Sequence, residues 1–146
     1  MKRRLSFIVI FLLLILSLSI PSVYSQQCKS MPPDIPEDLK KFSIINDEVS
    51  KPYGFDDIGC AIKWRATQCI SIQMTFDGAA KAHDFLTGEP IPVKDAFYVM
   101  GADIKTPQAS GIVAFKTRKE AEEFLKNGGK NGKILTFDEL INKVIE

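Results

Sequence analysis

The chain has 146 residues, of which 19 are basic and 18 acidic, so its formal net charge is only +1. No basic patch or arginine-rich strip stands out, which argues against a nucleic-acid partner. The length and the hydrophobic content of 45% are sufficient for one domain with a modest core.

The N-terminal segment has the pattern of a secretory signal. Three basic residues at positions 2–4 precede an apolar run at positions 5–20, and small residues, Val23 and Ser25, follow. The run is about 16 residues long, shorter than the roughly 20 that a membrane-spanning helix needs. We therefore expect cleavage after Ser25 and export to the periplasm or the extracellular space. Uncleaved, residues 5–20 would instead anchor the protein in the membrane.

Removal of residues 1–25 would leave 121 residues and a formal net charge of −2, because three basic and no acidic residues are lost. All three cysteines, Cys28, Cys60 and Cys69, lie in this exported part. An odd number leaves at least one thiol unpaired in an oxidising compartment, where burial or a bound metal would preserve it. A Cys60–Cys69 disulfide and a cysteine that serves only as a small apolar core residue are the alternatives.

Residues 26–40 are rich in proline and charge and are expected to form an extended N-terminal arm. Short apolar or alternating runs then predict strands, at residues 42–45, 49–55, 69–76 and 79–85. Pro52 places the second of these at a sheet edge. Asp56 or Asp57 is expected to cap a helix between the second and third strands. The turn signal Asp77-Gly78 joins the last two strands.

The second half of the chain repeats this plan. Strands are expected at residues 95–101, 112–115 and 133–137, and a long loop, residues 102–111, separates the first two. Thr117 and Glu120 form a capping box for a helix, and a short helix from Asp138 closes the chain. Both halves therefore read strand–strand–helix–strand.

These elements predict the α+β class, with small antiparallel sheets and packed helices. We expect one domain, residues 41–146, built from two ββαβ-like halves at about 41–93 and 94–146. No nucleophile elbow, Walker loop or dinucleotide-binding glycine motif occurs, so we expect no enzymatic activity. The single histidine, His83, is interpreted as a surface or packing residue, and Asp56 and Asp57 as a helix cap.

Soft sulfur ligands are the remaining chemical feature of the exported chain, at Cys28, Met31, Cys60, Cys69, Met74 and Met100. Thiolates and thioethers suit Cu(I). A zinc site usually takes four Cys or His ligands, and the chain has no C-x-x-C motif to supply them.

Two segments carry a resemblance to a known family. They read YGFDDIGCAIKW, from Tyr53, and AHDFLTGEPIPVKDAFYVMGADIKTPQASGIVAFKTRKEAEEFLKNGGKNGKILTFDEL, from Ala82. Their order of elements resembles the NosL family, exported accessory proteins of nitrous oxide reductase. The resemblance implies a tandem ββαβ-type fold, and it implies that the protein binds Cu(I) and delivers it to a copper enzyme outside the cytoplasm.

The resemblance also implies where the metal would lie. The family's copper region is a cysteine–methionine motif near the start of the mature chain, typically C-G-M, helped by a P-M-G-H stretch in a later loop. Here the first motif reads Cys28-Lys29-Ser30-Met31, and the loop reads Pro107-Gln108-Ala109-Ser110. We expect Cys28 and Met31 to bind one Cu(I), with Cys60 as the third ligand.

The expected function is therefore Cu(I) binding and delivery to an extracytoplasmic copper enzyme such as nitrous oxide reductase, or to its assembly machinery. The alternative is a degenerate NosL-like module without metal, which would bind a protein or a small ligand through residues 102–111.

Overall fold

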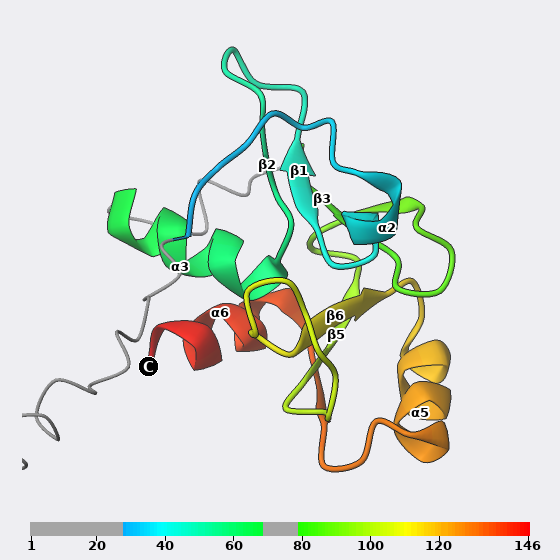
Figure 1. Cartoon of the computed structure of the whole chain (residues 1–146). Coiled ribbons are helices and arrows are strands. Elements are labelled where there is room, and N and C mark those ends of the chain that lie inside the picture. Colours follow the sequence, from blue (N-terminus) through cyan, green and yellow to red (C-terminus); the bar gives the residue numbers. More distant parts are fainter. Residues whose placement is uncertain (1–27, 69–78) are drawn as a thin grey trace, which may run out of the picture.

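The computed structural model describes residues 28–68 and 79–146 (Figure 1). The expected signal peptide, the strand at 69–76, the turn Asp77-Gly78 and Cys69 lie outside the described residues. Within the described part, no helix combines the length and the apolar character needed to cross a membrane.

The first sheet has four antiparallel strands in the order β2-β1-β3-β4. Their bounds are Ile44–Asn46 for β1, Tyr53–Phe55 for β2, Lys81–His83 for β3 and Pro90–Pro92 for β4. β2 lies at the end of this order, as the proline before it predicts. In this sheet, the first strand of the chain is central and the second and third flank it.

The second sheet has three antiparallel strands in the order β6-β5-β7. Their bounds are Phe97–Met100 for β5, Ile112–Phe115 for β6 and Lys133–Leu135 for β7. The central strand again comes first in the chain, so β6-β5-β7 has the same arrangement as β2-β1-β3. The predicted α+β class, with small antiparallel sheets and packed helices, is confirmed.

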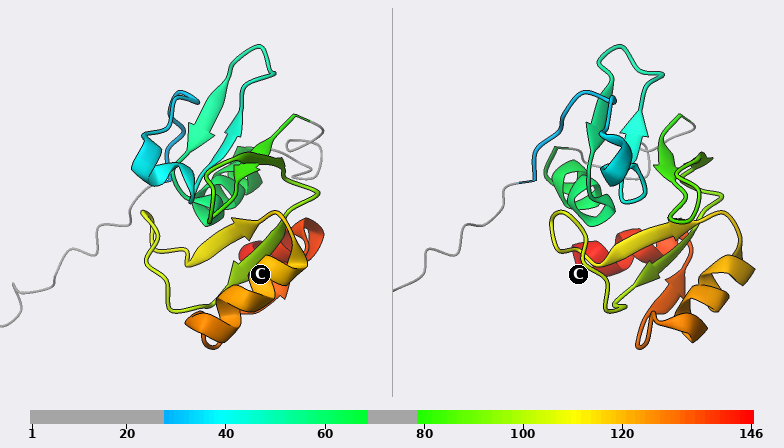
Figure 2. Two further views of the ribbon diagram at one scale, coloured as in Figure 1. Left: turned by 90° about the vertical axis from the view of Figure 1, so that its right-hand side faces the viewer. Right: turned by 45° about the vertical axis from the view of Figure 1, so that its right-hand side comes forward.

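Four helices accompany the described strands, and they are α2 at Glu37–Lys40, α3 at Ile58–Gln68, α5 at Arg118–Asn127 and α6 at Phe137–Ile145. α3 and α6 pack against each other, α3 also against β2 and α6 also against β5. Figures 1 and 2 show these two helices next to each other, and α5 on the other face of the second sheet from α6.

Side-chain alternation along β5 and β6 explains this layering. Tyr98 and Ile112 point into the core shared with α3 and α6. Val99 and Val113 point the other way, into the smaller core beneath α5. Both faces of the second sheet are therefore buried, and the sheet separates the two cores.

Capping boxes fix the starts of α5 and α6. Thr117 accepts a hydrogen bond from the Glu120 amide, and the Glu120 side chain reaches back to Thr117, as the sequence predicts. The same arrangement links Thr136 and Glu139 at the start of α6. That second box places the helix start at Phe137, one residue before the start expected from the sequence.

Two elements differ from the sequence-based expectation. The arm is not extended throughout, because Glu37–Lys40 forms one helical turn closed by an ion pair of 2.6 Å between its end residues. The strand β4 was not expected, because two of its three residues are prolines. It lies at the end of the sheet order, where a missing N–H is tolerated, and Ile91 between the prolines is buried.

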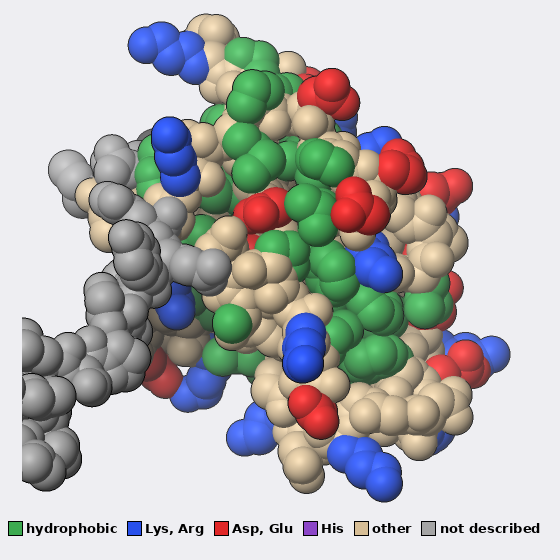
Figure 3. Space-filling model, viewed as in Figure 1, with side chains coloured by type: hydrophobic (Ala, Val, Ile, Leu, Met, Phe, Trp, Pro, Cys, Tyr) green, Lys and Arg blue, Asp and Glu red, His purple; other side chains and the backbone are tan. Residues whose placement is uncertain are grey.

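The described surface mixes charges of both signs. On the face drawn in Figure 3, Lys and Arg side chains alternate with Asp and Glu around a band of hydrophobic side chains. Neither sign forms a continuous patch on this face.

Candidate functional site

The N-terminal arm is held on the outer edge of β2. The Met31 amide donates to the Gly54 carbonyl at 2.9 Å, and the Gly54 amide donates to the Met31 carbonyl at 2.7 Å. Gly54 allows this approach because it has no Cβ. A Cβ there would lie too close to the arm, at 2.8 Å from Ile35 Cδ1 and 3.0 Å from the Pro32 carbonyl oxygen. The missing side chain at this one position lets the arm pack flat on the strand.

The arm brings two of the three expected ligands together. Cys28 is bonded to Cys60 as a disulfide, with their Cα atoms 5.2 Å apart across 32 positions of sequence. Cys60 is buried in the first turn of α3, and Cys28 is half-buried. Cys60 therefore pairs with Cys28 and not with Cys69. Met31, the remaining expected ligand, is half-buried three residues after Cys28.

Asp57 fixes the start of α3 and, with it, the position of Cys60. One carboxylate oxygen, Oδ1, accepts a hydrogen bond of 3.0 Å from the Cys60 amide, which is the cap expected from the sequence. The other, Oδ2, accepts from the Thr106 hydroxyl at 2.6 Å and from the Gln108 amide at 3.1 Å. A single buried carboxylate thus ties the loop of residues 102–111 to the helix that carries Cys60.

The same loop touches α3 directly at Gly59. A Cβ at Gly59 would lie 2.5 Å from Ser110 Cβ, so the loop packs on the backbone one residue before Cys60. The Thr106 hydroxyl also accepts a hydrogen bond from the Gly111 amide, which closes the loop on itself. The loop in which the resemblance expects methionine and histidine therefore lies beside the helix start, but Pro107 to Ser110 bring neither side chain.

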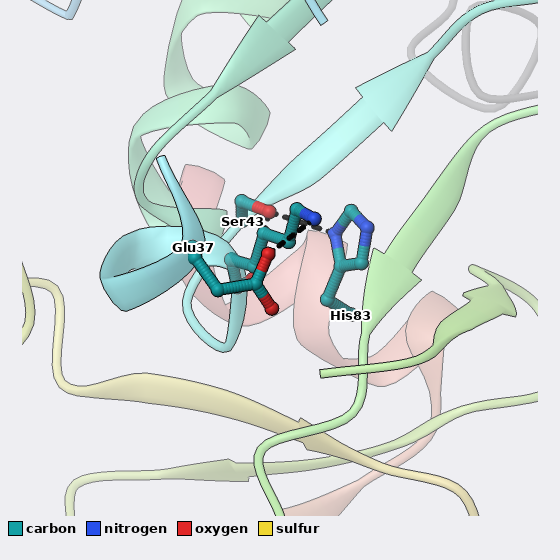
Figure 4. Close-up of polar contacts among 4 residues, drawn as sticks. Glu37, Ser43 and His83 are labelled. Carbon is teal, nitrogen blue, oxygen red and sulfur yellow. Dashed lines mark hydrogen bonds and ion pairs between the residues drawn. The ribbon is translucent and has the colours of Figure 1, made fainter. Parts of the chain in front are cut away.

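His83 lies elsewhere and has a structural contact. The residue is 5% exposed, and its Nδ1 lies 2.8 Å from the Ser43 hydroxyl (Figure 4). Because that hydroxyl donates to the Lys40 carbonyl, the ring N–H is the donor in the contact with Ser43. Burial, and then the nearby Lys40 charge, lower the pKa of His83. Ser43 is fully buried, and its hydroxyl proton is donated to the Lys40 carbonyl. The pair therefore lacks the exposed hydroxyl that a nucleophile requires.

The described residues contain no group of three or more His, Cys, Asp or Glu side chains able to hold a metal ion. A third donor to a metal held by the Cys28–Cys60 pair would therefore be of another type, and the thioether of Met31 is such a donor. Two features of this site were missed by sequence reasoning. The contact of Gly54 with the arm and that of Asp57 with the loop both join residues far apart in the chain, and no local pattern signals them.

Comparison with known proteins agrees with the resemblance. The family model NosL matches residues 40–145. The match includes Cys60 and the loop of residues 102–111, and it begins after Cys28 and Met31. No curated protein and no solved structure matches the chain. With most of its length covered by this match, the chain belongs to the NosL family, a family of copper-binding accessory proteins.

Proposed function

We propose that this NosL-family protein is exported, binds one Cu(I) through Cys28, Met31 and Cys60, and delivers the metal to an extracytoplasmic copper enzyme such as nitrous oxide reductase. The observation that most supports this is the pairing of Cys28 with Cys60, whose Cα atoms lie 5.2 Å apart. Two thiols from separate elements, with a thioether three residues away, form a soft donor set suited to Cu(I).

Copper binding at these sulfurs requires the dithiol form. Reduction of the Cys28–Cys60 disulfide takes up two electrons and two protons, which a dithiol reductant supplies as it is oxidised to its own disulfide. The two thiols then lose their protons to the solvent as the metal binds. Cys60 lies in the first turn of α3, where the positive end of the helix favours the negative charge of a thiolate.

The loop of residues 102–111 supports the proposal that such a site releases its metal. It is fixed beside Cys60 by Asp57, yet its residues 107–110 bring no sulfur or imidazole to the metal. Two thiolates and one thioether would hold Cu(I) with fewer donors than the family pattern supplies. A protein that passes its metal to a client benefits from such a limited ligand set.

The test is an anaerobic Cu(I) titration of residues 26–146, fully reduced, against a competing chelator. We expect one Cu(I) per protein, the largest loss of affinity in Cys28→Ser, and a smaller loss in Met31→Leu. Cys60→Ala is expected to weaken binding while the protein stays folded. Cys69→Ser is the matched control, and its affinity is expected to equal that of the unchanged protein.

Unchanged affinity in Cys28→Ser would refute the assignment of the site. Absence of Cu(I) binding by the reduced protein would instead favour the metal-free alternative, in which residues 102–111 hold a protein or a small ligand.

Export and delivery have separate tests. Intact-mass measurement of the protein from the exported fraction is expected to give a chain that begins at Gln26, and a retained N-terminal segment would refute the cleavage. Copper transfer is measured by incubating the loaded protein with copper-free nitrous oxide reductase and then separating the two. We expect copper in the enzyme fraction, and retention by the loaded protein would refute delivery.

A further inference from the structure

A cavity of about 440 Å³ opens between the arm, the tip of the β1–β2 hairpin and α3. Its walls include Ser30 of the arm, Ser50, Lys51 and Tyr53 of the hairpin, and Trp64 and Arg65 of α3. The volume falls within the range typical of small-ligand sites. The cavity does not contain the sulfur atoms of the proposed copper site among its lining residues.

Arg65 is the most informative residue of this cavity. Its guanidinium carbon lies 4.0 Å from the centre of the Tyr53 ring and 5.2 Å from that of Trp64. Its Nε is buried and has no hydrogen-bond partner among the described residues. In the described part of the chain, no carboxylate forms an ion pair with it. A buried donor without an acceptor is costly, and such groups in native proteins commonly meet a ligand, an ion or water.

The charge of the cavity is positive. Among the described residues, its lining includes the cations Lys51 and Arg65 and no acidic side chain. The two acidic residues of the same hairpin, Asp47 and Glu48, pair with Lys81 at 3.2 and 3.0 Å and do not line the cavity. An anion would therefore meet two cations and, within residues 28–68 and 79–146, no opposing carboxylate.

We infer that this cavity binds a carboxylate. The planar edge of a guanidinium matches the two oxygens of a carboxylate, and Arg65 is oriented by stacking on Tyr53. The half-buried ring of Trp64 adds an apolar surface beside this cation, suited to the hydrocarbon or aromatic part of the ligand. The hydroxyls of Ser30 and Ser50 add hydrogen-bond donors at the walls.

A carboxylate of this kind has two sources, a free small molecule or the acidic side chain of a peptide segment. The binding does not depend on copper, because no lining residue is a proposed ligand. It is therefore measured on the metal-free protein with its disulfide intact, so that failure here leaves the copper proposal untouched.

Trp64 supplies the measurement, because it is the only tryptophan of the chain and lines the cavity. Its fluorescence is followed while residues 26–146 are titrated with benzoate, with a short blocked peptide containing one glutamate, and with inorganic phosphate. We expect a saturable change with benzoate or the peptide. Arg65→Gln is expected to raise Kd about tenfold or more, since it removes charge-assisted hydrogen bonds.

The variants separate recognition from folding. Lys51→Gln is expected to raise Kd by a smaller factor, because its side chain is exposed at the edge of the cavity. Arg118→Gln is the matched control, since Arg118 also stacks on an aromatic ring, that of Phe97, but does not line this cavity. Thermal unfolding shows whether Arg65→Gln is folded. If it is not, Arg65→Lys is the test variant instead. It keeps the positive charge but loses the planar guanidinium, so it is expected to bind the carboxylate more weakly.

Saturation by benzoate alone would identify a small-molecule carboxylate, and saturation by the peptide alone would identify an acidic segment of a partner. Either result supports the inference. It is overturned if neither produces a saturable change, if phosphate binds as tightly as the carboxylates, or if the decisive Arg65 variant binds as well as the unchanged protein.

Discussion

Gly54 is the residue on which the arm's position most depends. In Gly54→Ala, the new Cβ meets Ile35 Cδ1 and the Pro32 carbonyl, and the second of these is backbone that moves only with the whole arm. We expect the substitution to lower the free energy of unfolding by about 1–3 kcal/mol, the usual cost of overpacking. Hydrogen exchange at the Met31 amide is expected to accelerate in the same variant.

Gly128→Ala is the control for this change, because a Cβ at Gly128 meets nothing within 4 Å. Its hydrogen exchange at Met31 is expected to match that of the unchanged protein. Slow exchange at Met31 in Gly54→Ala would contradict the role given to this glycine.

His83 makes stability depend on pH. Burial and the Lys40 charge lower its pKa in the folded protein, so the unfolded chain takes up the proton more readily. Neutral His83 therefore makes its full contribution to the free energy of unfolding above the ordinary histidine pKa of about 6.5. This contribution is lost as the pH falls through the lowered pKa of the folded state. We expect the free energy of unfolding, measured in urea, to fall between about pH 7.5 and about pH 5.5.

His83→Asn is the matched comparison, since an amide N–H can still reach the Ser43 hydroxyl. Because the chain has only one histidine, the variant is expected to lose most of the pH dependence in this range. Equal slopes in both proteins would show that the His83 proton is not linked to folding.

Among the elements, α3 depends on Asp57 for its cap and for its contact with residues 102–111. In Asp57→Asn, one acceptor oxygen becomes an NH₂ group, which can no longer accept from both the Cys60 amide and the loop donors. We expect a loss of about 1–3 kcal/mol in the free energy of unfolding, as for other buried groups left without a partner. The Gln108 amide is expected to exchange its hydrogen faster.

The neighbouring residue supplies the control for this prediction. Asp56 is half-buried, and its side chain has no hydrogen bond or ion pair within the described residues. Asp56→Asn is therefore expected to change the free energy of unfolding by no more than about 0.5 kcal/mol and to leave hydrogen exchange at the Gln108 amide unchanged. If both variants behave alike, Asp57 does not hold the loop.

The elements that could be predicted from the sequence are those with a strong local signal. The capping box at Thr117, the cap at Asp57 and the apolar run of β6 are local patterns, and the structure has each of them. β4 could not be predicted, because Pro90 and Pro92 disfavour a strand and the pairing with β3 that stabilises it is tertiary. α2 was missed because one helical turn is too short to show periodicity.

The candidate site was predicted less completely, for a physical reason. Soft sulfur chemistry left six candidate ligands, and the family resemblance implied Cys28, Met31 and Cys60. Three cysteines allow three pairings, and the sequence does not choose among them. The choice follows from Met31 pairing with Gly54, which carries Cys28 to the start of α3. The Arg65 cavity was not anticipated, because its walls come from three separate segments.

For the whole molecule, the Cys28–Cys60 disulfide fastens the arm to the domain. It closes a loop with a sequence separation of 32 residues, for which chain entropy gives about 3–4 kcal/mol of stabilisation. We expect reduction to lower the free energy of unfolding by about this amount, and with it the midpoint of thermal unfolding. Cu(I) is expected to raise the midpoint again, because it closes the same loop and binds the folded state.

The double variant with Cys28→Ser and Cys60→Ser is the control for reduction. Its midpoint is expected to equal that of the reduced protein without metal and to be insensitive to reductant and to Cu(I). A Cu(I)-dependent rise in this variant would indicate a metal site elsewhere in the chain.

The central claim is that sulfur atoms of the arm and of α3 hold one Cu(I), and X-ray absorption at the copper edge tests it most directly. The reduced protein with one Cu(I) is expected to show only sulfur neighbours, two or three in number, and Cys28→Ser is expected to lose one of them. Coordination by nitrogen or oxygen alone, or a sulfur shell unchanged in Cys28→Ser, would contradict the account.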